Sequence, residues 1–333
     1  MTLTQTAILI RRGTIVALIA VVLVIIGAVG YKIWHQYYLS SLPPVEEKPE
    51  MKFGVLPKLN FPPSMVSSSN FSYSLDTVTG GLPQTPQLLK VYFIPQSGVS
   101  FLAPEKSKTL AQNLGFPIGP QIISASQYKF TDENTNELTI DLTNSNFHFQ
   151  TSITENGTAT SSADLKNLSN QTSNQVKLID DFKSYLSSKN LLREELQNGR
   201  SYAAFGENTI VSIWPVNLDN LPIVSASPNQ SLVKTTITKT EKEEFIRLDY
   251  TFWVIDQTTF STYKLKTSEQ AFADLRSGLG FISLEPKKPE VSISSVYLAY
   301  FESEEYSPYL QPVFVFEGPD FAAIVPAVAT ATR

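Results

Sequence analysis

The sequence lacks cysteine, and it has only two histidines among its 333 residues. Without cysteine there is no disulfide, no thiolate nucleophile and no cysteine-ligated metal, so the fold must depend on hydrophobic cores alone. The histidines, His35 and His148, form no His-Glu-x-x-His motif, and Gly-x-Ser-x-Gly and a glycine-rich phosphate loop are also missing. If the domain is exported from the cell, its lack of cysteine points to bacteria rather than animals.

Charge is also scarce. Lys, Arg, Asp and Glu make up 17% of the chain, below the roughly 25% of typical soluble proteins. The net charge is −5 and no basic patch is present, so nucleic acid is not an expected partner. We expect no catalytic residue, no cofactor, no metal and no enzymatic activity.

Acidic residues do cluster at three places in the chain, at Asp180-Asp181, at Glu241/Glu243/Glu244 and at Glu302/Glu304/Glu305. Paired carboxylates can hydrolyse glycosides or hold calcium. However, the aspartates fall in the N-terminal half of a predicted helix, where acids favour the helix dipole, and the glutamates fall in predicted turns. We therefore interpret all three clusters as solvated surface.

One long apolar run contrasts with this composition. No charged residue lies between Arg12 and Lys32, and at ~1.5 Å per residue such a stretch covers roughly 28 Å, about the thickness of the bilayer core. We predict a single membrane-spanning helix over residues 13–35, with the lipid bilayer as its partner. A cleaved signal peptide is the alternative, because residues 27–30 loosely match a small-residue cleavage site.

Charge at the two ends of the run predicts its orientation. Arg11 and Arg12 precede it, and an excess of positive charge marks the cytoplasmic side. We therefore predict a cytoplasmic tail over residues 1–12, and an extracytoplasmic location at the cell membrane for residues 36–333.

The predicted span is followed by a stalk over residues 36–66. Six prolines lie between residues 41 and 66, and they favour a stiff, extended chain over a helix. Four apolar residues near its end are expected to dock on the first domain: Phe53, Leu56, Leu59 and Phe61.

The remaining chain predicts an α+β fold, built from repeated units of one helix packed on a curved antiparallel β-sheet. The units are 67–153, 154–258 and 259–333. Alternating or β-branched segments predict strands at 71–77, 88–94, 122–130, 137–143, 146–153, 209–214, 221–227, 232–239, 245–255, 259–267, 281–286, 291–302, 309–318 and 321–328. Helices are predicted at 104–114, at 176–189 and directly after Thr267, with a polar loop at 154–175 and a turn between Gly199 and Gly206.

The third unit has the clearest local signals. Thr267 and Gln270 form a capping-box pattern, and Gly278 or Gly280 ends the helix that follows. The segments 312–316 and 322–328 are nearly continuous apolar runs, so they are expected to be central strands.

This third unit resembles the C-terminal lobe of YycH/YycI-type regulators, and it is similar to PepSY-type domains, over residues 259–333 but not over 53–153. The residues that carry the resemblance are Glu269, Ala271 and Leu275 in the helix, Leu298 and Tyr300 in one strand, and Gln311-Pro312 and Gly318 in the next. The resemblance implies a single-pass anchored, extracytoplasmic module, with a membrane protein such as a sensor kinase as a partner.

Aromatic residues next to the last acidic cluster are the best candidates for a binding surface. Tyrosines with carboxylates suit contact with proteins or glycans. The candidate partner-binding residues are Tyr300, Phe301, Glu304, Glu305, Tyr306 and Tyr309. We interpret His148, which alternates with two phenylalanines, as a surface or hydrogen-bonded strand residue.

The expected function is therefore that of a non-enzymatic, membrane-anchored binding or regulatory module of the bacterial cell envelope. Two alternatives remain open. A carboxylate-dependent glycan hydrolase needs two acidic side chains about 5–10 Å apart across a cleft. A structural envelope component would assemble with copies of itself.

Overall fold

The computed structural model describes residues 23–32, 34–35, 37–38, 48–64, 66–96, 98–152, 175–205, 208–227, 229–238 and 245–329. Residues 1–48 and 49–333 form two separate units. In the first unit, residues 23–32 are helical. The described part of the chain includes no helix that is both long and apolar enough to cross a bilayer. The predicted tail, and residues 13–22 of the predicted span, lie outside the described residues.

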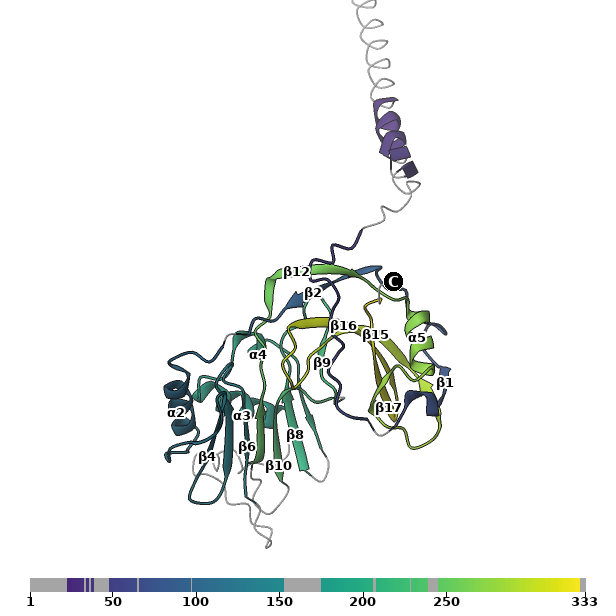
Figure 1. Cartoon of the computed structure of the whole chain (residues 1–333). Coiled ribbons are helices and arrows are strands. Elements are labelled where there is room, and N and C mark those ends of the chain that lie inside the picture. The colour runs from purple at the N-terminus through teal and green to yellow at the C-terminus, as the bar shows by residue number, and fades with distance from the viewer. Residues whose placement is uncertain are drawn as a thin grey trace, which may run out of the picture. The chain divides into compact units, whose positions relative to one another are not determined.

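The second unit is α+β, as predicted, and most of its regular structure is β-sheet (Figure 1). Its helices are η1 (Ser68–Asn70), α2 (Ala103–Asn113), α3 (Gln175–Ser188), α4 (Glu194–Gln197) and α5 (Ser268–Arg276). The predicted helices at 104–114 and 176–189 correspond to α2 and α3.

An eight-stranded antiparallel sheet has the order β3-β4-β5-β6-β11-β10-β8-β7. Its strands are β3 (Gln121–Ser124), β4 (Gln127–Thr131), β5 (Glu137–Asp141), β6 (Phe147–Gln150), β7 (Ser201–Ala204), β8 (Asn208–Ile213), β10 (Val233–Thr238) and β11 (Phe245–Tyr250). Every second residue of the central strands joins one hydrophobic core with α2 and α3. The residues between them face away from this core, so the sheet has one apolar face and one polar face.

A second, mixed sheet holds β12-β2-β16-β15-β9 in that order, and β17 pairs with both β16 and β13. Its strands are β2 (Leu88–Phe93), β9 (Ile223–Val224), β12 (Asp256–Lys264), β13 (Phe281–Leu284), β15 (Ser295–Phe301), β16 (Tyr309–Gly318) and β17 (Phe321–Pro326). The strands β1 (Ser72–Leu75) and β14 (Glu290–Ile293) pair in parallel beside it. Helix α5 packs against β17.

The prediction of central strands at 312–316 and 322–328 is confirmed. Strand β16 pairs with β2, β15 and β17, and seven consecutive residues of β16 are buried. A strand buried on both faces has no polar face, which is why its sequence shows no alternation.

Strand pairing crosses the predicted borders of the three units. Strand β11 pairs with β6, so 67–153 and 154–258 share one sheet. Strand β2 from the first unit pairs with β12 and β16 from the third. A local sequence pattern shows which face of a strand is buried, but not which distant strand lies beside it.

Several predicted element boundaries are wrong for a local reason. The predicted strand 122–130 is a hairpin, because the chain reverses between β3 and β4 in a two-residue turn. The predicted strand 291–302 is interrupted at Ser294, and the predicted turn between Gly199 and Gly206 contains β7. Alternation continues through a short turn, so it does not reveal a reversal. The predicted loop lies almost entirely outside the described residues.

The capping box of α5 is confirmed. The hydroxyl of Thr267 accepts a hydrogen bond from the backbone N–H of Gln270 at 3.2 Å, and the side-chain oxygen of Gln270 accepts one from the Thr267 N–H at 2.9 Å. Both donors would otherwise be unpaired at the start of the helix, so the box defines where α5 begins.

Residues 49–61, which we call the strap, dock on C-terminal strands of the second sheet, whereas the predicted contact was with the first unit. The Phe61 ring stacks on Phe281 and contacts Phe301, with centroids 4.9 and 4.8 Å apart. The Phe53 ring stacks on Tyr309 at 4.8 Å. The expected docking therefore occurs, but its target is the sheet formed by C-terminal strands, because these strands present aromatic rings to the strap.

Candidate functional site

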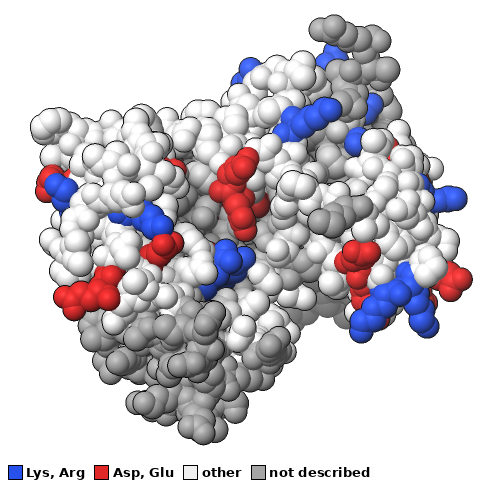
Figure 2. Space-filling view, turned by 60° about the horizontal axis from the view of Figure 1, so that its bottom comes forward, with Lys and Arg blue, Asp and Glu red and all other residues white. Residues whose placement is uncertain are grey.

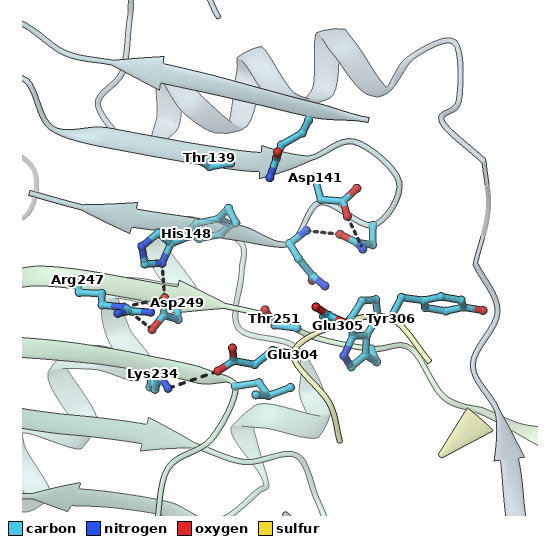
Figure 3. A pocket seen from close by; sticks show the side chains of 16 residues that line it. Thr139, Asp141, His148, Lys234, Arg247, Asp249, Thr251, Glu304, Glu305 and Tyr306 are labelled. Carbon is cyan, nitrogen blue, oxygen red and sulfur yellow. Dashed lines mark hydrogen bonds and ion pairs between the residues drawn. The ribbon is translucent and has the colours of Figure 1, made fainter. Parts of the chain in front are cut away.

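A cavity of about 470 Å³ lies on the polar face of the eight-stranded sheet (Figure 3). We call it the polar groove. Its lining includes Gln127, Thr139, Asp141, Asn144, Asn146, Phe147, His148, Leu232, Lys234, Arg247, Asp249, Thr251, Trp253, Glu304, Glu305 and Tyr306.

Strand register explains why these side chains meet. One row of directly opposed residues crosses four neighbouring strands, and it consists of Thr139, His148, Asp249 and Lys234. Opposed residues of an antiparallel pair project to the same face with Cβ atoms roughly 5 Å apart. Phe147 and Phe149 on either side of His148 enter the hydrophobic core, which leaves the imidazole on the groove side.

The centre of the groove is a three-residue ionic group. Nδ1 of His148 hydrogen-bonds to Oδ1 of Asp249, and Nε of Arg247 donates to both carboxylate oxygens of Asp249 at 3.1 and 2.9 Å. The Asp249 side chain is only 14% exposed. Burial favours a raised pKa for Asp249, but the hydrogen bonds from His148 and Arg247 outweigh burial and hold that pKa below its ordinary value. Asp249 therefore carries a fixed negative charge.

The opposite wall comes from the turn between β15 and β16. The Glu304 carboxylate lies 4.0 Å from the ammonium group of Lys234, and Figure 3 shows it directed toward that lysine. Glu305 accepts a hydrogen bond from Nδ2 of Asn60 at 3.2 Å, so the strap contacts this rim. The turn is held by the indole N–H of Trp253, which donates to the carbonyl of Ser303 at 2.8 Å.

One buried donor in the groove wall has no partner. The side-chain oxygen of Asn146, a residue that is 8% exposed, accepts from the backbone N–H of Phe252 at 3.0 Å. Its Nδ2 makes no hydrogen bond within the described part of the chain. A buried donor left unpaired costs about 1–3 kcal/mol, so an oxygen atom of a ligand or water that reached this Nδ2 would remove that cost.

The six predicted binding residues lie in three different places: the polar groove, the contact with the strap, and the core around β15. Glu304, Glu305 and Tyr306 line the polar groove. Tyr309 does not line the groove. Its ring stacks against the ring of Phe53 in the strap.

Tyr300 and Phe301 are core residues, so the prediction that they are exposed is wrong. Tyr300 is 0% exposed, and its hydroxyl donates to the carbonyl of Lys90 at 3.1 Å. Phe301 is 3% exposed and contacts Phe61. Both belong to β15, whose two faces are covered by separate cores. Neither residue can contact a partner directly.

The interpretation of the acidic clusters as solvated surface is wrong at Glu302. This residue is 7% exposed, and burial raises the pKa of its carboxyl group to about 8. Glu304, Glu305 and Asp180 are exposed, as expected, and Asp181 is half-buried. The cluster at 241–244 lies outside the described residues.

Four charged residues of the groove did not emerge as site candidates from the sequence: Asp141, Lys234, Arg247 and Asp249. The available signal was the alternation of the segment 245–250. Arg247 and Asp249 alternate there with the buried residues Leu248 and Tyr250, so they face the other side of the strand. The interpretation of His148 as a hydrogen-bonded strand residue is confirmed. Within the described residues, no group of three or more His, Asp or Glu side chains is placed to hold a metal ion.

A second cavity of about 460 Å³ lies beside the strap, and it is mostly apolar. Its lining includes Val55, Leu56, Leu59, Tyr263, Leu279 and Val328.

Comparisons with known proteins do not indicate a function for this chain, so the groove is the basis for proposing one. No family model matches the sequence, and no curated protein does. Among solved structures, an uncharacterized protein from Eubacterium rectale is similar over 76% of this chain and 87% of its own chain, with 11% sequence identity and a TM-score of 0.34. A similarity this low supports no inference about fold or activity.

Proposed function

We propose that the chain is a non-enzymatic, membrane-anchored extracytoplasmic module that acts by contact, with the polar groove as its binding site. The observation that carries this proposal is the concentration of charged, amide and aromatic side chains around one cavity of ligand size. Small-molecule and recognition sites typically enclose ~300–1,000 Å³ and combine apolar walls with a few oriented polar groups.

The anchor in this proposal is the segment 13–35, which carries no charge before Lys32, with the N-terminus in the cytoplasm. Limited proteolysis tests this arrangement. A protease added to intact cells should remove residues 36–333 from the membrane, whereas a cytoplasmic control protein should stay intact. Protection in whole cells, with cleavage only after lysis, would contradict the extracytoplasmic location. A mature N-terminus near residue 30 would instead show that the run is a cleaved signal peptide.

The resemblance of residues 259–333 to YycH/YycI-type and PepSY-type domains supports a regulatory role. A membrane protein such as a sensor kinase is the partner that this resemblance implies. Contact through the groove would leave the core of the second sheet unchanged, because Glu304 and Glu305 are exposed on the rim.

Site-specific photocrosslinking in living cells tests binding through the groove. A photoreactive amino acid at position 305 should capture the native partner, whereas the same probe at position 285, an exposed glutamate outside the groove lining, should not. Equal capture at both positions, or none at position 305, would contradict the proposal. Crosslinks only between copies of this chain would support the structural alternative instead.

Hydrolysis of a glycan is the second candidate function, because four carboxylates line the same cavity: Asp141, Asp249, Glu304 and Glu305. A glycosidase needs one carboxylic acid with a raised pKa as proton donor. Asp249 has the opposite tendency, since its two basic partners lower its pKa. Release of reducing ends from cell-wall glycan, abolished by Glu304→Gln or Glu305→Gln, would favour the hydrolase over the binding module.

A further inference from the structure

The groove lies on the face of a sheet, and this position limits what it can recognise. The row at its floor belongs to β5, β6, β11 and β10, and each of these strands is paired on both sides. Their backbone N–H and C=O groups are used between strands, so a peptide cannot add to the sheet here as a further strand. Recognition must come from side chains.

The charged groups of the groove favour some ligands over others. Four of the charged lining residues are acidic and two are basic, Lys234 and Arg247. Both basic groups already face carboxylates, Glu304 and Asp249 respectively. An anionic polymer would therefore meet more negative than positive charge, which disfavours nucleic acids and phosphate-rich chains.

The polar groups alternate between donors and acceptors over short distances. Asp249 lies between His148 and Arg247, and Glu304 lies beside Lys234. An amide side chain with a donor and an acceptor end is present at Gln127. Both ends of the Asn144 amide are already used within the chain, because its Nδ2 donates to Asp141 and its Oδ1 accepts from the Asn146 N–H. A hydroxyl group is itself one donor and two acceptors, so it matches such an alternating surface better than a group of one sign does. Figure 2 shows the same mixing on the face drawn there, where acidic and basic groups lie in small adjacent clusters.

Aromatic rings form part of the same wall. The rings of Trp253 and Tyr306 are 5.7 Å apart between centroids, and both residues line the cavity with Leu232. Trp253 is only 8% exposed, so Tyr306 supplies the more accessible ring. The negative face of an aromatic ring attracts the weakly positive C–H groups of a sugar ring. The wall also contains the unpaired Nδ2 of Asn146, which a ligand oxygen or a bridging water would satisfy.

We propose that the polar groove binds an oligosaccharide, whose hydroxyl groups bond to the alternating donors and acceptors and whose ring packs against Tyr306. A sugar that carries an ammonium group gains additional ion pairs with Glu304 and Glu305. This inference rests on the proposed function, because it names the class of ligand for the same groove.

Isothermal titration of the full-length chain tests the inference, in a detergent without a sugar headgroup. The probes are chitotetraose, its fully de-N-acetylated form, and a lysine-containing tetrapeptide of similar length. We expect both saccharides to bind, the ammonium form more tightly at low salt. Glu305→Gln should weaken the ammonium form about tenfold and chitotetraose much less. The matched control Glu285→Gln, which changes a carboxylate outside the groove lining, should change neither.

Three results would overturn the inference: neither saccharide binds, saccharide binding is unaffected by Glu305→Gln and Asp249→Asn together, or the tetrapeptide alone binds. These results are distinct from failure of the proposed function. A crosslinked protein partner at position 305 without saccharide binding would keep the contact module and reject only the sugar. A variant that shows no thermal unfolding transition is unfolded and cannot be used. Glu304→Gln then takes its place, because Glu304 is exposed on the rim.

Discussion

The two sheets of this protein differ in how their strand faces are buried. In the eight-stranded sheet, strand β6 alternates between buried phenylalanines and half-buried or exposed polar residues. In the second sheet, strand β16 is buried for most of its length. The first sheet has a free polar face on which a groove forms, whereas the second has both faces occupied by cores and by the strap. The comparison shows that both sheets supply a hydrophobic core, and that the eight-stranded sheet also has a face on which polar groups gather.

The largest difference between the sheets should appear when a core ring is removed. Phe314 of β16 is 0% exposed, so Phe314→Ala should lower the free energy of unfolding by about 3–5 kcal/mol. Thr139→Ala, on the polar face of β5, should change it by less than about 0.5 kcal/mol. Urea unfolding of the full-length chain measures both. Similar losses for the two variants would contradict the contrast between a strand buried on both faces and a strand with a polar face.

The buried carboxyl group of Glu302 should make stability depend on pH. Its folded pKa of about 8 lies above the ordinary value of 4.5, so its contribution is fully present below pH 4.5 and is lost as the pH rises through 8. Between pH 6 and 9 the wild-type chain should lose roughly 2–3 kcal/mol relative to Glu302→Gln. Parallel pH profiles for the two proteins would show that the carboxyl group is not buried as described.

The ionic group in the groove should respond to pH in the opposite direction. The lowered pKa of Asp249 stabilises the fold above its ordinary value near 3.8, and this contribution is lost as the pH falls through the folded pKa. Asp249→Asn should therefore lower stability by about 1 kcal/mol at pH 7, and the difference should shrink toward zero in acid. Thermal melts at pH 7 and at low pH test this. A constant difference would indicate a packing effect instead.

The last of these effects, no larger than that of Asp249, concerns the start of α5, the helix that packs against β17. Thr267→Ala removes the capping hydroxyl and should cost about 1 kcal/mol, whereas Thr267→Ser should cost much less because it keeps the acceptor. Chemical denaturation of both variants makes the comparison. Equal losses for alanine and serine would show that the threonine methyl group, and not the cap, matters.

The sequence was sufficient where a feature depends on neighbouring residues. The capping box at Thr267, the helix α3 and the strand β6 all follow from local patterns, and so does the placement of His148 on the polar face. These signals depend on spacing within one element, so they do not require knowledge of the rest of the fold.

The groove could not be predicted in the same way. His148 and Asp249 meet only because β6 pairs with β11, which is about a hundred residues further along the chain, at a register that opposes these two positions. Tyr300 and Phe301 were selected because they adjoin glutamates, but the chain turns at Glu302, which is itself buried. Residues next to each other in sequence therefore have opposite environments, a contrast that depends on tertiary packing.

The strap has a mechanical consequence for a tethered protein. Its first residues are fastened to β12, where the backbone N–H groups of Glu50 and Lys52 donate to the side chains of Thr262 and Ser261 at 3.1 and 2.8 Å. Only later does it reach the groove rim through Asn60 and Glu305. If residues 1–48 anchor the chain as proposed, tension entering at residue 49 would load the attachment to β12 before it reached the contact between Asn60 and Glu305.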